Sequence, residues 1–295
     1  MGIVAVTGAT GQVGGRVSAR LSAKGMRHRV LARHPGRMVS SELAEVAAFE
    51  GYDDEAGLRA AFAGVDDLVL VSAHEHPDRV SLHRTVVEEA AAAGVQRVVY
   101  VSFLGAAPDA TFTYARDHWH TEQLLRESGL VWVALRDSMY HAGWPLFVGD
   151  DDTLRGPAAD GRVASVAHDD VADVVVAALR IGVGSREGYV RDVTGPEPLT
   201  LTQIAEQLTA AVGRTITYVP ETLDEAYASR AGYGAADWEV AGWVSTYTAI
   251  AAGELDVVST TVEDLTGRPA QSFAAWLEAN PGALSRLRRL TPHAL

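Results

Sequence analysis

The stretch TGATGQVGG, residues 7–15, decides how this chain folds. It follows the apolar, β-branched run IVAV at residues 3–6, and it opens a segment in which Val13, Val17 and Leu21 recur at every fourth position. A short β-branched run is typical of a buried strand, and apolar residues four apart are typical of one helix face. The sequence therefore predicts a strand, a glycine-rich turn and a helix in direct succession.

The glycines at positions 8, 11 and 14 fit a loop that holds the phosphates of a dinucleotide. Gly8 permits a tight turn, Gly11 lets a pyrophosphate approach the backbone, and Gly14 lets the helix pack closely on the strand. The unpaired N–H groups at the start of the helix attract negative charge. A purely structural turn is the alternative, but the position after the first strand favours cofactor binding. The expected contacts are Thr7, Gly8, Ala9, Thr10, Gly11, Gln12, Val13 and Gly14.

Short strand-like runs alternate with helical patterns up to residue 136. The later runs are HRVL (28–31), VAAF (46–49), LVLVS (68–72), RVVYVS (97–102) and LVWVAL (130–135). Helices are expected between them, for example at 78–93 and 114–128. Valine-rich strands separated by helices predict a parallel sheet covered on both faces, and right-handed crossovers then give a doubly wound Rossmann α/β fold.

The alternation loosens after Arg136. Residues 163–195 contain a further helical pattern and the run YVRDV, and they are expected to return to the sheet. They would then belong, with residues 1–136, to an NADP-binding domain.

Two other segments, 137–162 and 196–295, are expected to form a smaller, mainly helical region, which we call the C-terminal region. In it, residues 137–162 read as a long irregular stretch, Thr200 or Thr202 should cap a helix, and ITYVP (216–220) reads as a small strand. We expect this region to bind substrate as a lid on the carboxyl edge of the sheet.

The composition of the chain argues against several kinds of partner and chemistry. The formal net charge of −13 would repel a phosphate backbone, so nucleic acid is not an expected partner. No apolar run approaches the roughly 20 residues of a membrane span, so no membrane is expected either. The chain has no cysteine, which excludes disulfides and thiolate chemistry and suits a reducing cytoplasm. A monomer or a homodimer is expected.

The residues after the second strand bear on the choice of cofactor. NAD-binding chains usually carry a carboxylate there for the ribose 2′-hydroxyl. Here VLARHPGR offers Arg33 and Arg37 with no acid between them. Guanidinium groups can hold a 2′-phosphate, so we expect NADP(H), although Arg33 could also be an ordinary surface arginine.

The motifs resemble those of the NmrA-like branch of the short-chain dehydrogenase/reductase superfamily. The similar segments are TGATGQVGG, YDDEAGLRAAFAGVDDLVLVS, AAAGVQRVVYVS and ARDHWHTEQLLRESGLVWVALR. The branch includes zinc-independent NAD(P)H:quinone oxidoreductases, triphenylmethane reductase and regulators that bind the dinucleotide without catalysis. The resemblance implies the fold and the cofactor.

The resemblance also implies a catalytic set. The superfamily uses Ser, Tyr and Lys, the last two spaced YxxxK, and the matching positions here are Ser102, Tyr114 and His118. The missing lysine would bind the nicotinamide ribose and, as a cation, lower the tyrosine pKa. Because Tyr114 and His118 are four apart on a helix, we expect both to face the cleft. His118 is then expected to contact ribose or substrate, with an ordinary helix histidine as the alternative.

Several further positions are expected near the cofactor cleft. Residues 49–53 lie at the end of the third strand, where relatives commonly carry Gly-Asp. The aspartate position here is Gly51, so backbone contacts from Gly51 and Tyr52 to adenine are expected. Ser72 ends the fourth strand and Ala73 follows it. The segment His74-Glu75-His76 invites a metal interpretation, but adjacent side chains rarely converge on one ion, and no metal is expected. Candidate substrate contacts are His74, Arg136, Met139, Tyr140 and Trp144, with packing inside the lid as the alternative for the last four.

Two functions remain open at this point. The first is an NADPH-dependent reductase that transfers hydride to a quinone or a similar flat, conjugated acceptor. The second is a non-catalytic, NADP-binding redox sensor of the NmrA type. The missing lysine favours the sensor, and the retained Ser102 and Tyr114 favour the enzyme.

Overall fold

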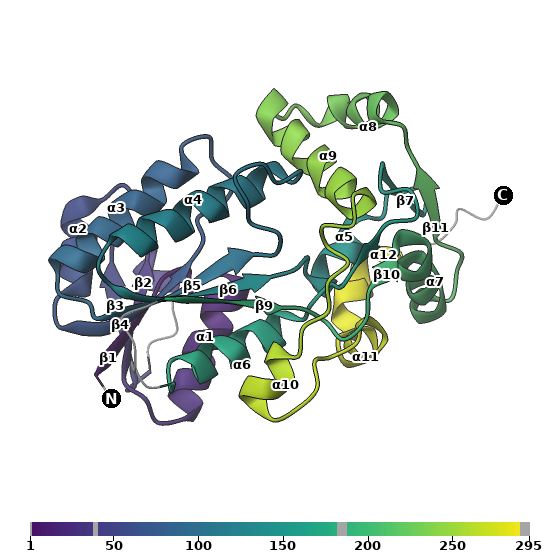
Figure 1. The fold of residues 1–295 in the computed structure, drawn as a ribbon. Coiled ribbons are helices and arrows are strands. Elements are labelled where there is room, and N and C mark those ends of the chain that lie inside the picture. The colour runs from purple at the N-terminus through teal and green to yellow at the C-terminus, as the bar shows by residue number, and fades with distance from the viewer. Residues whose placement is uncertain (1, 38–40, 182–187, 290–295) are drawn as a thin grey trace.

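A computed structural model of the protein describes residues 2–37, 41–181 and 188–289. Its centre is a seven-stranded sheet of order β3-β2-β1-β4-β5-β6-β9, in which every neighbouring pair is parallel (Figure 1). The strands are β1 (Ile3–Val6), β2 (His28–Ala32), β3 (Ala44–Ala48), β4 (Val65–Val71), β5 (Arg97–Phe103), β6 (Val131–Asp137) and β9 (Tyr189–Val193). The predicted doubly wound Rossmann fold is confirmed.

Helices cover both faces of this sheet because its strands are apolar on both sides. One face packs on α1 (Gln12–Ala23), α6 (His168–Ala178) and α10 (Thr261–Thr266), and the other on α2 (Glu55–Phe62), α3 (Arg79–Ala92) and α4 (Thr113–Glu127), as Figure 1 shows. The strand order reverses between β1 and β4, and ligands of such sheets bind at that point, beyond the carboxyl ends of the strands.

The third strand begins two residues earlier than predicted. The apolar run suggested 46–49, whereas β3 covers Ala44–Ala48. Phe49 is buried but lies just after the strand, because it packs into the core from the following loop. The apolar character of Phe49 therefore led the prediction to place the end of this strand one residue too late.

The C-terminal region contains two small sheets. The parallel pair joins β7 (Thr153–Gly156) to β11 (Thr217–Pro220), and the antiparallel pair joins β8 (Arg162–Val163) to β10 (Leu199–Thr200). The small strand expected at 216–220 is confirmed. The prediction that residues 137–162 are irregular is wrong in part, because they include β7 and the start of β8. These strands are too short to show the alternating hydrophobic pattern by which a strand is recognised in a sequence.

Short helices complete the C-terminal region. Thr200 caps α7, with its hydroxyl accepting from Gln203 N at 3.2 Å, so the first of the two expected caps is confirmed. The helices are α5 (Trp144–Phe147), α7 (Leu201–Val212), α8 (Leu223–Arg230), α9 (Asp237–Ala251), α11 (Phe273–Ala279) and α12 (Ser285–Arg289). The single 3-10 turns are η1 (Pro35–Arg37), η2 (His141–Gly143), η3 (Ala231–Tyr233) and η4 (Pro281–Leu284).

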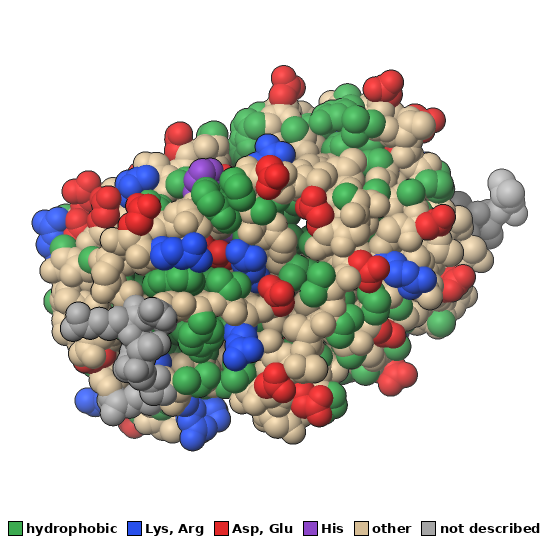
Figure 2. All heavy atoms as spheres, viewed as in Figure 1, with side chains coloured by type: hydrophobic (Ala, Val, Ile, Leu, Met, Phe, Trp, Pro, Cys, Tyr) green, Lys and Arg blue, Asp and Glu red, His purple; other side chains and the backbone are tan. Residues whose placement is uncertain are grey.

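Apolar side chains are gathered on the surface over α8 and the start of α9 (Figure 2). Leu223, Tyr227 and Tyr233 are exposed there, while Ala226 packs inward against Val244. Within the described part of the chain, we find no helix that is both long enough and apolar enough to cross a membrane.

Candidate cofactor and active site

The glycine loop has the geometry that a dinucleotide requires. Gly8 has a φ of +61°, and its carbonyl accepts from Gly11 N at 2.8 Å, which closes a tight turn. Gly11 is the N-cap of α1 and has no side chain to satisfy the first N–H groups of the helix. A Cβ on Gly14 would lie 2.4 Å from the Gly8 carbonyl oxygen, so glycine is required there. The loop therefore fits a pyrophosphate at the amino end of α1.

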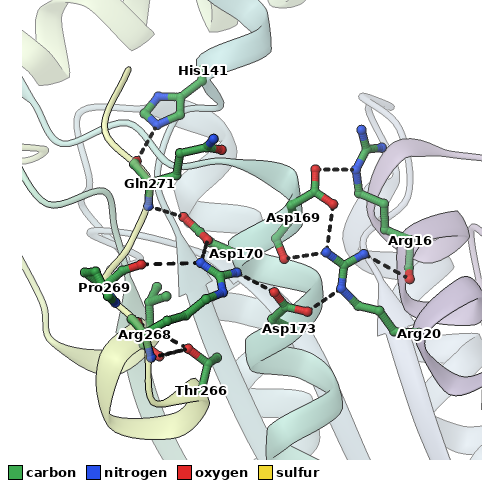
Figure 3. Close-up of polar contacts among 11 residues, drawn as sticks. Arg16, Arg20, His141, Asp169, Asp170, Asp173, Thr266, Arg268, Pro269 and Gln271 are labelled. Carbon is green, nitrogen blue, oxygen red and sulfur yellow. Dashed lines mark hydrogen bonds and ion pairs between the residues drawn. The ribbon is translucent and has the colours of Figure 1, made fainter. Parts of the chain in front are cut away.

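A network of charges holds α1 in place (Figure 3). Arg16 donates to Gln12 Oε1 at 2.6 Å and to Asp169 Oδ2 at 3.2 Å, and Arg20 pairs with Asp169 at 2.7 Å. On the far side of α6, Asp170 accepts from Arg268 at 2.6 Å. Because these contacts join α1 to α6 and to the segment after α10, the glycine loop at the start of α1 rests on a fixed support.

The candidate 2′-phosphate residues follow β2. Arg33 is exposed directly after the strand, and no carboxylate pairs with it among the described residues. Arg37 ends η1, and its side chain lies outside the described part of the structure. An exposed guanidinium at this point is available to an anion.

Tyr52 has a contact that the sequence did not indicate. Its hydroxyl donates to the Val71 carbonyl at 2.6 Å, and burial raises its pKa to about 12. It thus ties the loop after β3 to the end of β4, beside Ser72 and Ala73. Gly51 precedes it in the same loop.

His118 lies against the sheet, and both of its ring nitrogens have partners. Nδ1 is 2.8 Å from the Tyr100 hydroxyl, and Nε2 is 3.2 Å from Arg79 Nη2. Burial, and then the nearby Arg79 guanidinium, lower the pKa of His118 well below its usual value. The imidazole is therefore neutral at pH 7 and is engaged inside the protein.

Tyr114 lies one turn earlier on α4 but meets different neighbours. Its hydroxyl donates to Glu75 Oε2 at 3.4 Å, in the loop after β4, and its ring lies under Gly242 of α9. A Cβ on Gly242 would come within 2.4 Å of the Tyr114 hydroxyl. Burial, together with the Glu75 carboxylate, raises the pKa of Tyr114. The two residues share a helix face as expected, but they share no hydrogen bond.

Ser102 belongs to a separate buried cluster. Its hydroxyl donates to Glu122 Oε1 at 2.7 Å, and Arg136 makes a two-bond ion pair with the same carboxylate at 2.8 and 2.7 Å. Ser102 and Glu122 have no exposed surface. The proton of Ser102 and the charge of Arg136 are thus both committed to Glu122.

The other candidate substrate residues are dispersed. His74 is exposed, Met139 packs against the core of the C-terminal region, and Trp144 is fully buried in that core, in agreement with the packing alternative. Tyr140 donates to the buried carboxyl of Asp137 and stacks on His168 with ring centroids 3.9 Å apart. Burial raises the pKa of Asp137 to about 8.

The residue-by-residue comparison with the family missed Arg79, Glu122 and Asp137. The spacing held a signal for Glu122, because Tyr114, His118 and Glu122 follow one another at four-residue intervals along α4. Arg79 and Asp137 carried no such signal, since only the fold brings α3 and β6 beside α4. Among the described residues, no group of three potential metal ligands converges.

Comparisons with known proteins show the family of this chain. The model of a family described as NAD(P)H-binding matches residues 8–181. Quinone oxidoreductase 2 of Escherichia coli is 34% identical over 232 residues, which cover 76% of this chain and 79% of that protein. (4-Alkanoyl-5-oxo-2,5-dihydrofuran-3-yl)methyl phosphate reductase of Streptomyces griseus is 34% identical over 93% of this chain and 96% of that protein.

Solved structures of NADPH- and NADP(H)-bound reductases are similar to this chain. The Escherichia coli quinone oxidoreductase complexed with NADPH matches with a TM-score of 0.83 at 30% identity, covering 94% of this chain and 99% of that chain. Triphenylmethane reductase of Citrobacter sp., complexed with NADP(H), matches with a TM-score of 0.78 at 25% identity, covering 94% and 99%. The sensor alternative has less support, because these relatives are named as reductases. The chain therefore belongs to the NAD(P)H-binding family, as its resemblance to NmrA-like short-chain dehydrogenases/reductases implied.

Proposed function

We propose that this chain is an NADPH-dependent oxidoreductase that reduces a quinone or a similar flat, conjugated acceptor. The glycine loop would hold the pyrophosphate, Arg33 would hold the 2′-phosphate, and Tyr52, Ser72 and Ala73 would line the cofactor's path along the sheet edge. The bound cofactor supplies a hydride. The chain's own part is to position that cofactor and the acceptor and to keep water from the site.

The surroundings of Tyr114 favour a quinone over a simple ketone as the acceptor. A simple ketone needs a strong proton donor as its alkoxide forms. Tyr114 is a weak donor here, because its hydroxyl meets the Glu75 carboxylate and its pKa is raised. His118 cannot act as the missing cation, since it is neutral and both of its nitrogens are engaged. A quinone is less demanding, because its ring delocalises the negative charge of the reduced product.

The acceptor would lie between the loop after β4 and helix α9. Glu75 accepts from Trp243 Nε1 at 3.3 Å as well as from Tyr114, and the Trp238 ring lies 6.3 Å from the Tyr114 ring. Aromatic side chains of this kind stack on flat ligands. In this proposal α9 is the part of the C-terminal region that covers the site.

The test measures NADPH oxidation by the purified protein with one benzoquinone and one simple aliphatic ketone. We expect turnover with the quinone and little with the ketone. Tyr114→Phe should lower quinone turnover far less than the roughly 10²–10⁴-fold that losing a general acid costs. Tyr227→Phe, an exposed position on α8, is the matched control.

Two results would contradict the proposal. A loss of more than about a hundredfold in Tyr114→Phe, with the control unchanged, would show that the tyrosine supplies the proton. Absence of turnover with any acceptor, alongside tight NADPH binding, would favour the redox sensor.

A further inference from the structure

A buried cation lies beneath the cofactor edge of the sheet. Arg79, the first residue of α3, is 7% exposed. Its Nε donates to the Ala73 carbonyl at 3.0 Å, and its Nη2 donates to the Ser72 hydroxyl. The nearest carboxylate is Asp117, whose Oδ2 is 3.9 Å from Arg79 Nη1. The guanidinium therefore binds the segment that directly follows β4, where the cofactor is expected to pass.

The same guanidinium fixes the state of His118. Arginine can only donate hydrogen bonds, so His118 Nε2, at 3.2 Å from Nη2, must accept. The ring proton then lies on Nδ1, which faces the Tyr100 hydroxyl at 2.8 Å. His118 is held as one neutral tautomer in one orientation.

A second side chain of α3 completes the support. His83, one turn after Arg79, accepts from Ala73 N at 2.9 Å through Nε2, and its Nδ1 lies 2.7 Å from Thr121 Oγ1 of α4. Burial lowers the pKa of His83 to about 3, so it remains neutral. Both backbone polar groups of Ala73 are thus held by side chains of α3.

We propose that Arg79 supplies, from α3, a buried positive charge in place of the lysine of the superfamily's YxxxK pattern, and that it acts as a positioning residue for the cofactor. It holds Ser72, Ala73 and His118 in the arrangement that receives the nicotinamide half. A lysine at position 118 and Arg79 would place two cations side by side in a buried site, which is strongly unfavourable. A lysine at position 118 and an arginine at position 79 therefore exclude one another, and this explains why position 118 is a histidine.

A double-mutant cycle tests this proposal. Arg79→Gln, His118→Lys and the combination of both are compared with the unaltered protein by urea unfolding and by NADPH affinity. We expect Arg79→Gln to weaken NADPH binding about tenfold or more, because Ser72, Ala73 and His118 lose the charged hydrogen bonds that position them. His118→Lys alone should lower the unfolding midpoint markedly. The double variant, which again holds one cation, should recover much of both losses.

Two further variants sharpen the result. Arg79→Lys keeps the charge without the planar fork, so it should retain more NADPH affinity than Arg79→Gln. Arg84→Gln, an exposed position on the same helix, should change neither quantity.

The proposal is overturned if Arg79→Gln binds NADPH as tightly as the unaltered protein. It is also overturned if the double variant recovers stability but no NADPH affinity, because neighbouring residues couple in stability even when the arginine is purely structural. If Arg79→Gln does not fold, the double variant decides, and failure of that variant to fold counts against the proposal. These readouts need no acceptor, so they are independent of quinone reduction.

Discussion

The clearest quantitative prediction separates two roles within the glycine loop. A Cβ on Gly14 would meet three backbone atoms, Gly8 O at 2.4 Å, Gly8 C at 2.6 Å and Thr7 O at 2.6 Å. A Cβ on Gly11 would meet only Gly8 O, at 3.2 Å. Ordinary contact begins at 3.4 Å, so Gly14→Ala demands a shift of 1.0 Å (3.4 minus 2.4) and Gly11→Ala a shift of only 0.2 Å (3.4 minus 3.2).

The larger shift should cost more of the free energy of unfolding. Overpacking against rigid backbone costs about 1–3 kcal/mol, and the better helix propensity of alanine returns up to about 1 kcal/mol at Gly14. Because the clash at Gly14 is with three backbone atoms, the upper part of that range applies, about 2–3 kcal/mol, and the return of about 1 kcal/mol leaves a net loss in the free energy of unfolding of about 1–2 kcal/mol. Gly11→Ala should cost about 0.5–1 kcal/mol, because alanine is a poorer N-cap than glycine and the clash adds little. Both should weaken NADPH binding, Gly14→Ala by moving α1 and Gly11→Ala by occupying the phosphate's approach.

Urea unfolding and calorimetric titration with NADPH measure the two quantities separately. Gly282→Ala is the control, because a Cβ there meets nothing within 4 Å. Equal stability of the Gly14 and Gly11 variants would refute the packing argument. Undiminished NADPH affinity in Gly11→Ala would mean that the loop only turns the chain.

Three other expectations follow from particular side chains. Arg33→Asp should reduce the preference for NADPH over NADH by about tenfold or more, and an unchanged ratio in titrations would remove Arg33 from the phosphate site. Arg97→Met should lower the free energy of unfolding by about 3–5 kcal/mol, because it leaves Asp67 buried without its 2.7 Å partner; a wild-type denaturation curve would contradict this. Stability should fall as pH decreases from 6.5 towards 4, since burial lowers the pKa of His141 and of His168 to about 4 and the unfolded chain binds protons that the folded one does not. Each such histidine contributes a slope of about 1.4 kcal/mol per pH unit. The buried Asp137, whose pKa is raised to about 8, contributes one opposing slope over the same range, so about 1.4 kcal/mol per pH unit is left from the two histidines and this aspartate. Equal unfolding midpoints in urea at pH 5 and pH 7 would exclude this.

The structure also revises an experiment that the sequence suggests. From YARDH alone, His118→Lys looks like a restoration of the family pattern that should lower the pKa of Tyr114. In the fold, position 118 faces Arg79 at 3.2 Å and not the Tyr114 hydroxyl. The substitution should therefore destabilise the protein before it activates the tyrosine.

The sequence by itself determined the sheet, its order of elements and the cofactor loop. Strands β1, β4, β5 and β6 are dense runs of buried valine and leucine, and the glycines of residues 7–15 have few other uses after a first strand. Such signals are local, because hydrophobic period and backbone freedom act over a few neighbouring residues. The cap at Thr200 was predictable for the same reason.

Only the tertiary structure decided what the polar residues at the edge of the sheet do. Ser102 and Arg136 meet on Glu122, Tyr114 meets Glu75 and Gly242, and these partners come from separate strands, helices and loops. A side chain's protonation and its partners depend on which distant groups are brought within about 3 Å, where desolvation and charge act most strongly. No local pattern encodes that distance, and so the sequence named the candidate residues while the fold assigned their contacts.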